Sequence, residues 1–325
     1  MSTSSAPVRV LVAGAGAFGR EHLGRLARRS DVNVVGVADA DPAALKKIRS
    51  SHGGIICRAD PLRLIEDVEA GAIIIATPAA SHVEICVRAL GRNLCVLLEK
   101  PVAPSATAAA PLIASSRSSS GFVLPGHVLR FSQDHVRLVE IVRSGRIGEV
   151  VYVNSRRYRD ESHAVRYPDT DPILMTLIHD VDLAQWVTSS DFRSVLARRS
   201  GDAGYRSMTA VSATTTTGVT CDLRTAWTFV DGELPPDRLE VVGDHGSAEL
   251  VVGHGLHVYE EGRRTGYPTA EADDPLRNEQ DHFLGCVRDR SRAPALDLPQ
   301  ALAGLKLADA AIESLRLNRE VLLST

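Results

Sequence analysis

The sequence predicts an α/β protein: a doubly wound parallel sheet of the Rossmann type, followed by an α+β domain with a large, open, mainly antiparallel sheet. Short apolar runs alternate with helical stretches through the first part of the chain, as in repeated βαβ units. A glycine-rich loop follows the first of these runs. Beyond about residue 126 the strands lengthen and alternate apolar with polar residues, which is typical of a sheet with one solvated face.

The length of the chain indicates two domains, because 325 residues exceed what one hydrophobic core usually supports. We predict that residues 1–125 bind a dinucleotide. Residues 126–325 are expected to bind substrate and to form the contact between subunits. Packing of their C-terminal helices against the first domain is left open.

The first strand is predicted at residues 8–13, a β-branched apolar run between Pro7 and Gly14. Similar runs predict strands at 32–38, 72–76, 94–98 and 122–124, with helices at 19–29 and 82–90 between them. In the second half, strands are predicted at 149–158, 194–199, 207–216, 219–229, 237–242, 247–251 and 257–260. Helices are expected at 173–187 and at 299–317, the latter with Asp297 as a cap.

Composition limits the class of partner. The net charge is −3, with 44% hydrophobic and 24% charged residues, so no polybasic field recruits nucleic acid or an anionic membrane. No apolar stretch has a membrane-spanning length, and the first residues lack a secretory pattern. The five cysteines contain no Cys-x-x-Cys pair, which favours free thiols in a reducing compartment. We expect a cytoplasmic protein with a small-molecule ligand and no nucleic-acid or membrane partner.

A glycine loop follows the first strand directly and opens a helix, the context in which G-x-G-x-x-G indicates a dinucleotide site. The first glycine permits a tight turn, the second lets the backbone approach the pyrophosphate, and the third allows close packing of helix and strand. A glycine turn without a ligand is the alternative. The cofactor-binding residues predicted here are Gly14, Gly16, Ala17, Phe18 and Gly19.

Asp39 ends the second predicted strand about 20 residues after the loop, where a carboxylate accepts hydrogen bonds from an adenosine ribose. No arginine follows it to hold a 2′-phosphate, so NAD is favoured over NADP. Alternatively, Asp39 caps the helix that begins near Pro42.

Lys100 follows a buried strand, within Glu99-Lys100-Pro101. The carboxyl ends of strands line the ligand crevice of a doubly wound sheet, so its ammonium is expected near a nicotinamide ring. Oxidation of a carbinol needs a base for the hydroxyl proton, and a lysine with a lowered pKa serves that purpose. Alternatively, Lys100 is a surface lysine that pairs with Glu99 and has no catalytic role.

Four motifs together carry a resemblance to a known family, and they are Gly14 to Gly19, Ala76-Thr77-Pro78 with His82, Glu99-Lys100-Pro101 and Ile178-His179-Asp180. In these motifs the chain resembles the glucose-fructose oxidoreductase and inositol dehydrogenase family, Gfo/Idh/MocA, over nearly its whole length. The resemblance implies that Lys100 contacts the substrate hydroxyl and the nicotinamide ribose. It also implies that Thr77, Pro78, His82 and Glu99 belong to the cofactor site.

The segment from Gly126 to Phe131 resembles the family segment that begins the second domain, and it makes His127 and Arg130 candidates for substrate binding. Arg130 bracing the packing between domains is an equal alternative. In the family's catalytic helix an aspartate precedes the histidine by four residues, whereas here Met175 precedes His179. A thioether accepts no proton at neutral pH, so either His179 and Lys100 act without that carboxylate, or Asp182 or Asp180 orients the ring instead.

These observations predict an NAD-dependent dehydrogenase or reductase acting on CH–OH groups of a sugar, an inositol or a sugar derivative. Lys100 and His179 are its expected catalytic residues, and Lys100, His127, Arg130, His179 and Asp182 its expected substrate-binding residues. No metal is expected, and His254-x-x-His257 is assigned to a turn. The alternatives are a catalytically impaired NAD-binding sensor or regulator, and a reductase of a non-sugar substrate. The resemblance also implies a homodimer or homotetramer formed through the second sheet.

Overall fold

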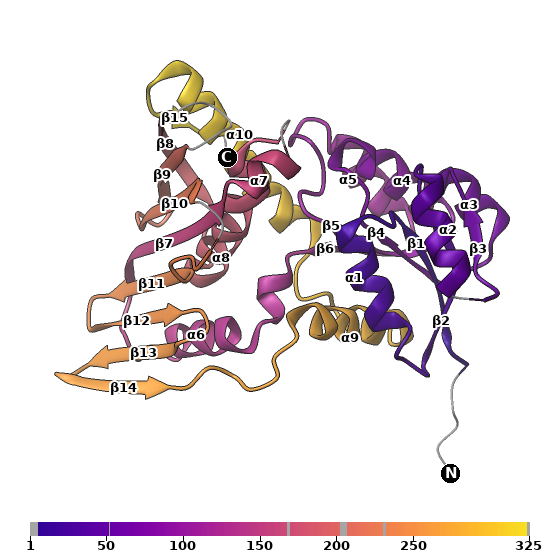
Figure 1. Cartoon of the computed structure of the whole chain (residues 1–325). Coiled ribbons are helices and arrows are strands. Elements are labelled where there is room, and N and C mark those ends of the chain that lie inside the picture. Colours follow the sequence, from indigo (N-terminus) through magenta and orange to yellow (C-terminus); the bar gives the residue numbers. More distant parts are fainter. Residues whose placement is uncertain (1–5, 52, 168–169, 202–206, 230–231, 324–325) are drawn as a thin grey trace, which may run out of the picture. The chain divides into compact units, whose positions relative to one another are not determined.

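The computed structural model describes residues 6–51, 53–167, 170–201, 207–229 and 232–323. By its internal contacts the chain forms two compact units (Figure 1). The first unit comprises Met1–Val128 and Leu276–Leu302, and the second comprises Leu129–Pro275 and Ala303–Thr325.

The first unit is built on a six-stranded sheet in the order β3-β2-β1-β4-β5-β6, with every pairing parallel. Its strands are β1 (Val8–Ala13), β2 (Val32–Ala38), β3 (Ile56–Arg58), β4 (Ala72–Ile75), β5 (Cys95–Glu99) and β6 (Val123–Gly126). All residues of β4 and β5 are buried, as expected of parallel strands covered on both faces. The predicted doubly wound sheet is confirmed, and β3 is added to it.

Helices connect these strands: α1 (Ala17–Leu26), α2 (Pro42–Ser51), α3 (Pro61–Asp67), α4 (Ala79–Gly91) and α5 (Ala110–Ser118). α9 (Pro275–Arg288) joins the same unit from Leu276 onward. Its buried Phe283 contacts Phe122 edge to face, with ring centroids 5.8 Å apart. This helix therefore packs in the core of the first sheet, although α9 begins about 150 residues after β6 ends.

The second unit holds a nine-stranded sheet in the order β14-β13-β12-β11-β7-β10-β9-β8-β15. Its strands are β7 (Val150–Asp160), β8 (Phe192–Ser200), β9 (Met208–Thr215), β10 (Thr220–Phe229), β11 (Arg238–Gly243), β12 (Gly246–Val251), β13 (Gly255–Glu260), β14 (Arg263–Tyr267) and β15 (Val321–Leu322). Among the described strands of this sheet, β7 and β10 alone pair in parallel. The predicted, mainly antiparallel sheet is confirmed.

One face of this sheet forms the core of the second unit. Buried side chains alternate with less buried ones along β9, and the buried set packs with residues of three helices. These helices are α6 (Gln133–Arg143), α8 (Ile178–Thr188) and α10 (Leu298–Leu317). Asp297 caps α10 as predicted, because its carboxylate accepts from the backbone N–H of Gln300 at 2.9 Å.

Shorter elements complete this half: the 3₁₀ turn η1 (Val128–Phe131), α7 (Ser162–Arg166) and the π-helical turn η2 (Ile173–Leu177). The single helix predicted at 173–187 is therefore η2 followed by α8. Within the described ranges, every helix is too short or too polar to cross a bilayer.

Candidate functional site

The glycine loop lies at the carboxyl end of β1, and packing explains two of its glycines. Gly14 has φ +97°, and its N–H donates to the carbonyl of Ala38 at 2.8 Å. A Cβ on Gly14 would lie 2.5 Å from the carbonyl oxygen of Ala76, and a Cβ on Gly19 would overlap the carbonyl of Gly14. Both positions therefore exclude any side chain, which closes the turn and seats α1 on the sheet.

Gly16 differs, because a Cβ there would meet nothing within 4 Å. It is the N-cap residue of α1 and makes no side-chain cap, and the first turn of α1 contains no acidic residue. The leading N–H groups of the helix therefore receive no side-chain cap from this residue, and they stand at the positive end of the helix dipole. Gly16 and the first turn of α1 thus form a cradle that fits an anion such as a dinucleotide pyrophosphate. Phe18, the neighbour in the loop, is 42% exposed.

Asp39 lies directly after β2 and braces the loop. Its Oδ2 accepts from the N–H of Ala15 at 2.5 Å, and its Oδ1 accepts from the N–H of Asp41 at 2.8 Å. The same carboxylate therefore supports both the glycine loop and the residues that lead into α2. The second of these contacts corresponds to the alternative role predicted from the sequence, in which Asp39 caps that helix. Asp39 is half-buried beside the glycine loop.

His82 of α4 lies between two loops at the carboxyl edge of the sheet. Its Nε2 is 2.7 Å from the carbonyl of Thr77, and its Nδ1 is 2.9 Å from the carbonyl of Pro101. Burial lowers the pKa of His82, although both carbonyls act against that shift. A neutral imidazole carries one N–H, so one of these contacts is a hydrogen bond at a time. The ring thereby links the Thr77-Pro78 loop to the turn that follows Lys100.

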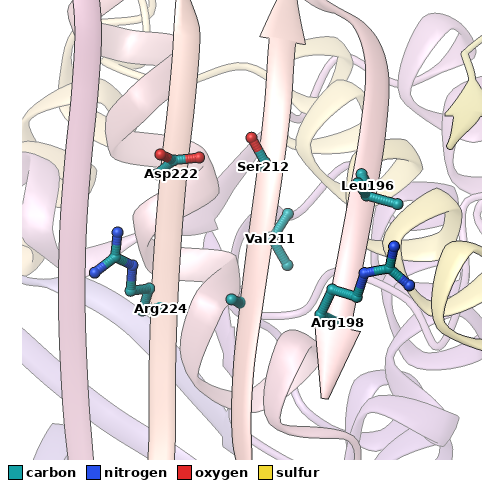
Figure 2. Close-up of a pocket in the computed structure, with 7 residues that line it drawn as sticks. Leu196, Arg198, Val211, Ser212, Asp222 and Arg224 are labelled. Atoms are coloured by element: carbon teal, nitrogen blue, oxygen red, sulfur yellow. The ribbon is translucent and has the colours of Figure 1, made fainter. Parts of the chain in front are cut away.

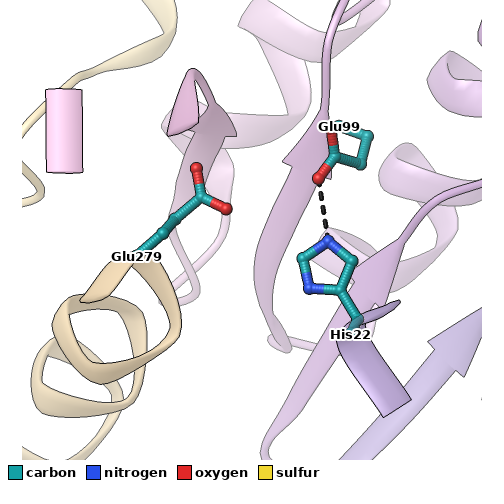
Figure 3. Close-up of side chains that lie close together, drawn as sticks. All are labelled: His22, Glu99 and Glu279. Carbon is teal, nitrogen blue, oxygen red and sulfur yellow. Dashed lines mark hydrogen bonds and ion pairs between the residues drawn. The ribbon is translucent and has the colours of Figure 1, made fainter. Parts of the chain in front are cut away.

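Glu99 and Lys100 stand at the carboxyl end of β5. The carboxylate of Glu99 is buried and lies 2.8 Å from Nε2 of His22 in α1 (Figure 3). Its other oxygen accepts from the backbone N–H of Lys100 at 3.3 Å. Lys100 itself is half-buried. The strand end, the glycine loop and the loop after β4 therefore share the carboxyl edge of the sheet, where ligand crevices of doubly wound folds form.

In the second unit, Arg130 of η1 forms a buried, bidentate pair with Asp182 of α8. Its Nε lies 2.9 Å from Oδ2, and its Nη2 lies 2.9 Å from Oδ1. Its Cζ is also 5.3 Å from the ring centroid of Trp186, a cation–π distance. These contacts attach η1 to α8.

Asp180 is held in a similar way by Arg157 of β7, with Nε to Oδ2 at 2.9 Å. Arg157 also donates to Asp237 at 2.5 Å. Both aspartates considered as partners for His179 therefore bind arginines. His179 is half-buried in the first turn of α8, and Met175 is half-buried in η2. His127 is buried at the end of the first unit, and His257 lies against Arg264 at 3.0 Å.

Sequence reasoning overlooked His22, Glu279 and Gln280, which are all buried in the first unit. His22 follows Gly19 by three residues on the buried face of α1, which was the one available signal. Glu279 and Gln280 lie in α9, a helix that was not predicted from the sequence. The contact between Gln280 and His22 joins residues 258 apart in the chain, which no local pattern reveals.

Comparison with known proteins adds a family context. Residues 8–127 match the family described as an oxidoreductase family with an NAD-binding Rossmann fold. Residues 135–249 match the GFO/IDH/MocA C-terminal domain.

Individual relatives extend this likeness. The chain is 31% identical over 250 residues to an inositol 2-dehydrogenase of Salmonella paratyphi B, covering 74% of this chain and 72% of that protein. It is 25% identical over 315 residues to inositol 2-dehydrogenase 4 of Saccharopolyspora erythraea, covering 94% and 92%.

Two solved structures share the fold. One is a myo-inositol 2-dehydrogenase from Lactobacillus plantarum, with a TM-score of 0.85, 20% identity and coverage of 98% of this chain and 100% of that one. The other is an oxidoreductase from Agrobacterium radiobacter in complex with NAD⁺, L-tartaric acid and magnesium, with a TM-score of 0.88, 18% identity and coverage of 97% and 98%.

Proposed function

Because this chain belongs to the Gfo/Idh/MocA family of NAD-binding oxidoreductases, we propose that it transfers hydride between NAD and a secondary alcohol of an inositol or related sugar-type polyol. The observation that carries the proposal is the position of Lys100. It follows β5 at the same sheet edge as the open cradle at Gly16. The inositol 2-dehydrogenases among the relatives support the substrate class.

The dinucleotide is held, in this proposal, by the glycine loop and Asp39. The N–H groups that begin α1 receive the pyrophosphate, and the space beside Gly16 admits it. The carboxylate of Asp39 accepts from ribose hydroxyls and repels a 2′-phosphate, which supports NAD over NADP. Ala17, Phe18, Thr77 and Pro78 are proposed as further contacts of the cofactor.

Lys100 is proposed as the acid or base of the reaction. In the oxidising direction its neutral amine takes the hydroxyl proton while the carbinol C–H bond breaks and a ketone forms. Bound NAD supplies the acceptor for the two electrons and the hydrogen that leave as hydride. In the reducing direction the ammonium of Lys100 returns the proton to the carbonyl oxygen.

His179 is proposed as a partner in substrate binding and proton transfer, with His127, Arg130 and Asp182 as further substrate-binding candidates. The support for His179 is its motif and the anchoring of its helix turn by two arginines. For Arg130 and Asp182 the buried mutual pair favours a supporting role in which they shape the site.

Hydride transfer to a polyol panel tests this function. We expect NAD⁺ reduction, measured by NADH absorbance, with myo-inositol, scyllo-inositol or a related sugar. Lys100→Ala should lower kcat by about 10²-fold or more, whereas NADH affinity should fall much less, because Lys100 contributes one of several cofactor contacts. Lys46→Ala removes an exposed lysine of α2 and serves as the control. Tight NAD binding without turnover of any panel member would contradict the proposal and favour a sensor.

We further propose that the protein is a homodimer or homotetramer joined through the second sheet. A shallow hollow lies on that sheet over β8, β9 and β10 (Figure 2). It is lined by Leu196, Arg198, Ala210, Val211, Ser212, Asp222 and Arg224. Side chains of both charges beside apolar ones suit a self-complementary contact. Light scattering coupled to size exclusion would contradict this if it measured one chain per particle.

A cytoplasmic location is proposed from the cysteines, which are all free thiols. Fractionation of cells producing a tagged protein checks this, and recovery in an extracytoplasmic fraction would contradict it.

A further inference from the structure

Three buried titratable side chains of the first unit meet beneath the Lys100 turn: His22 of α1, Glu99 of β5 and Glu279 of α9 (Figure 3). Their nearest side-chain N and O atoms lie within 4.8 Å of one another. Glu279 is 0% exposed, and neither of its carboxylate oxygens has a hydrogen-bond partner among the described residues. Figure 3 shows its carboxyl group directed toward the other two side chains. A buried polar group in this state requires an explanation.

The tautomer of His22 follows from Gln280. Nε2 of Gln280 lies 3.2 Å from the backbone carbonyl of His22 and 3.0 Å from its Nδ1. A carbonyl oxygen only accepts, so the amide nitrogen is the donor at this position, and Nδ1 accepts from it as well. The proton of the neutral ring therefore sits on Nε2, which donates to Glu99 at 2.8 Å.

Glu99 is then a carboxylate with two donors, the ring of His22 and the N–H of Lys100. Gly126 of β6 closes one side of it, since a Cβ there would lie 3.1 Å from Cδ of Glu99. Glu279 approaches from α9. Burial and the neighbouring charge of Glu99 both raise the pKa of Glu279 well above its ordinary value.

Two negative carboxylates cannot share this enclosed space without a cation or a proton. A cation fits poorly. The proton on Nε2 of His22 leaves that atom no lone pair, and its 2.8 Å contact with Glu99 is shorter than the about 3.3 Å that separates ligand atoms of a tetrahedral zinc ion. A proton needs no additional volume.

We propose that Glu279 is an uncharged acid that faces Glu99 and thereby acts as a positioning residue for Lys100. The carboxylate of Glu99 accepts from His22 of α1 and from the backbone N–H of Lys100. An uncharged Glu279 within 4.8 Å adds no charge that would repel this carboxylate, so the backbone that follows Glu99 is held in place. This inference rests on the proposed role of Lys100 in proton transfer.

Glutamine tests the protonation state, because it keeps the shape and a donor but has no charge to acquire. Glu279→Gln should retain kcat within about threefold, whereas Glu279→Ala should lower kcat at least tenfold with little change in NADH affinity. Glu84→Gln, which alters an exposed glutamate of α4, is the matched control.

Two further measurements do not depend on turnover. In wild type at about pH 7, infrared spectroscopy should detect a protonated carboxyl band that Glu279→Gln removes and Glu84→Gln retains. The unfolding equilibrium constant of wild type should also rise with pH above the ordinary glutamate pKa, by up to about tenfold per unit relative to Glu279→Gln. The sign follows because the folded state holds a proton that the unfolded state has released.

These readouts separate the two proposals. If the protein turns over no polyol, the proposed function fails, but the infrared band and the pH dependence still decide the state of Glu279. A stoichiometric metal, measured by elemental analysis of the purified protein and lost in Glu279→Gln, would overturn the inference. So would a glutamine variant as impaired as the alanine variant.

Discussion

At the scale of single residues, Gly16 and Gly19 are glycines for different physical reasons. Substituting Gly16 should therefore affect NAD affinity, whereas substituting Gly19 should affect stability. Gly16→Ala adds a methyl group in open space at an extended backbone position, so the free energy of unfolding should change by less than about 0.5 kcal/mol. The methyl group occupies the proposed pyrophosphate path. NAD affinity should therefore fall about tenfold or more, measured by NADH fluorescence.

Gly19→Ala is the matched comparison. Its methyl group would overlap the carbonyl of Gly14, so α1 must move away from β1. We expect a loss of more than about 2 kcal/mol in denaturant unfolding. Equal stability of the two variants, or unchanged NAD affinity of Gly16→Ala, would contradict this assignment.

Asp39 predicts cofactor preference. Asp39→Asn keeps an oxygen that can accept from the N–H of Ala15, but it removes the charge that repels a 2′-phosphate. We expect the ratio of kcat/KM for NAD over NADP to fall by about tenfold, with little loss of stability. Steady-state rates with both cofactors measure this ratio, and an unchanged ratio would assign Asp39 to bracing the loop alone.

The site residues predicted from the sequence are those that local spacing brings together. The loop glycines and Asp39 lie within one βαβ unit, and Lys100 directly follows a buried strand. His22 and Glu99 are 77 residues apart, and Glu279 arrives from a helix near the other end of the chain. No local pattern encodes such a meeting, because it depends on which side of the sheet each helix packs against.

At the scale of elements, α8 depends on arginines that come from other segments. Arg130 and Asp182 are each nearly fully buried, so removing one leaves the other charge without its bidentate partner. Asp182→Leu should cost about 3–5 kcal/mol in the free energy of unfolding. The double variant Arg130→Met/Asp182→Leu should recover part of that loss.

A double-mutant cycle from denaturant unfolding measures this coupling. Arg63→Met/Glu66→Leu removes an exposed pair on α3 and should show a coupling below about 1 kcal/mol. A similarly small coupling for the buried pair would contradict the anchoring role.

Element boundaries show where periodicity stops being informative. The apolar pattern at 173–187 correctly predicted a helix. It did not reveal the π-helical turn over 173–177, because the buried residues Ile173, Thr176 and Leu177 are spaced as in an α-helix. β3 escaped prediction because it has three residues and no fully buried position. Both elements are defined by hydrogen bonding to neighbours, which a single-sequence pattern does not contain.

At the scale of the whole molecule, the order of the two sheets was predictable, and the assignment of each helix to one of the two units was less so. The change from buried short runs to alternating long strands correctly separates the two sheets. α9 has an ordinary amphipathic pattern, with Leu276, Phe283 and Leu284 buried, that would suit either unit. Its place beside Phe122 depends on ring packing rather than on any feature of its own sequence.

The stability of the whole molecule in acid depends on the buried His135, whose lowered pKa predicts a loss of stability as the pH falls. Burial and the positive charge of Arg157 lower the pKa of His135 to about 3, although Asp237 acts against this. Below about pH 6.5 the unfolded chain therefore takes up a proton that the folded chain does not. The free energy of unfolding should fall by about 1.4 kcal/mol per pH unit from this group alone as pH drops from about 6.5 toward 3.

His135→Gln cannot take up this proton in either state, so its unfolding free energy should depend less steeply on pH in that window. The variant will lose some stability near neutral pH, because the imidazole packs in the interior and contacts Ser132 at 3.0 Å. The slope, rather than the absolute value, is thus the informative quantity. His245→Gln, at a side chain 77% exposed, should retain the wild-type slope. Urea unfolding over a pH series measures all three proteins, and equal slopes for His135→Gln and wild type would show that His135 is protonated in the folded state.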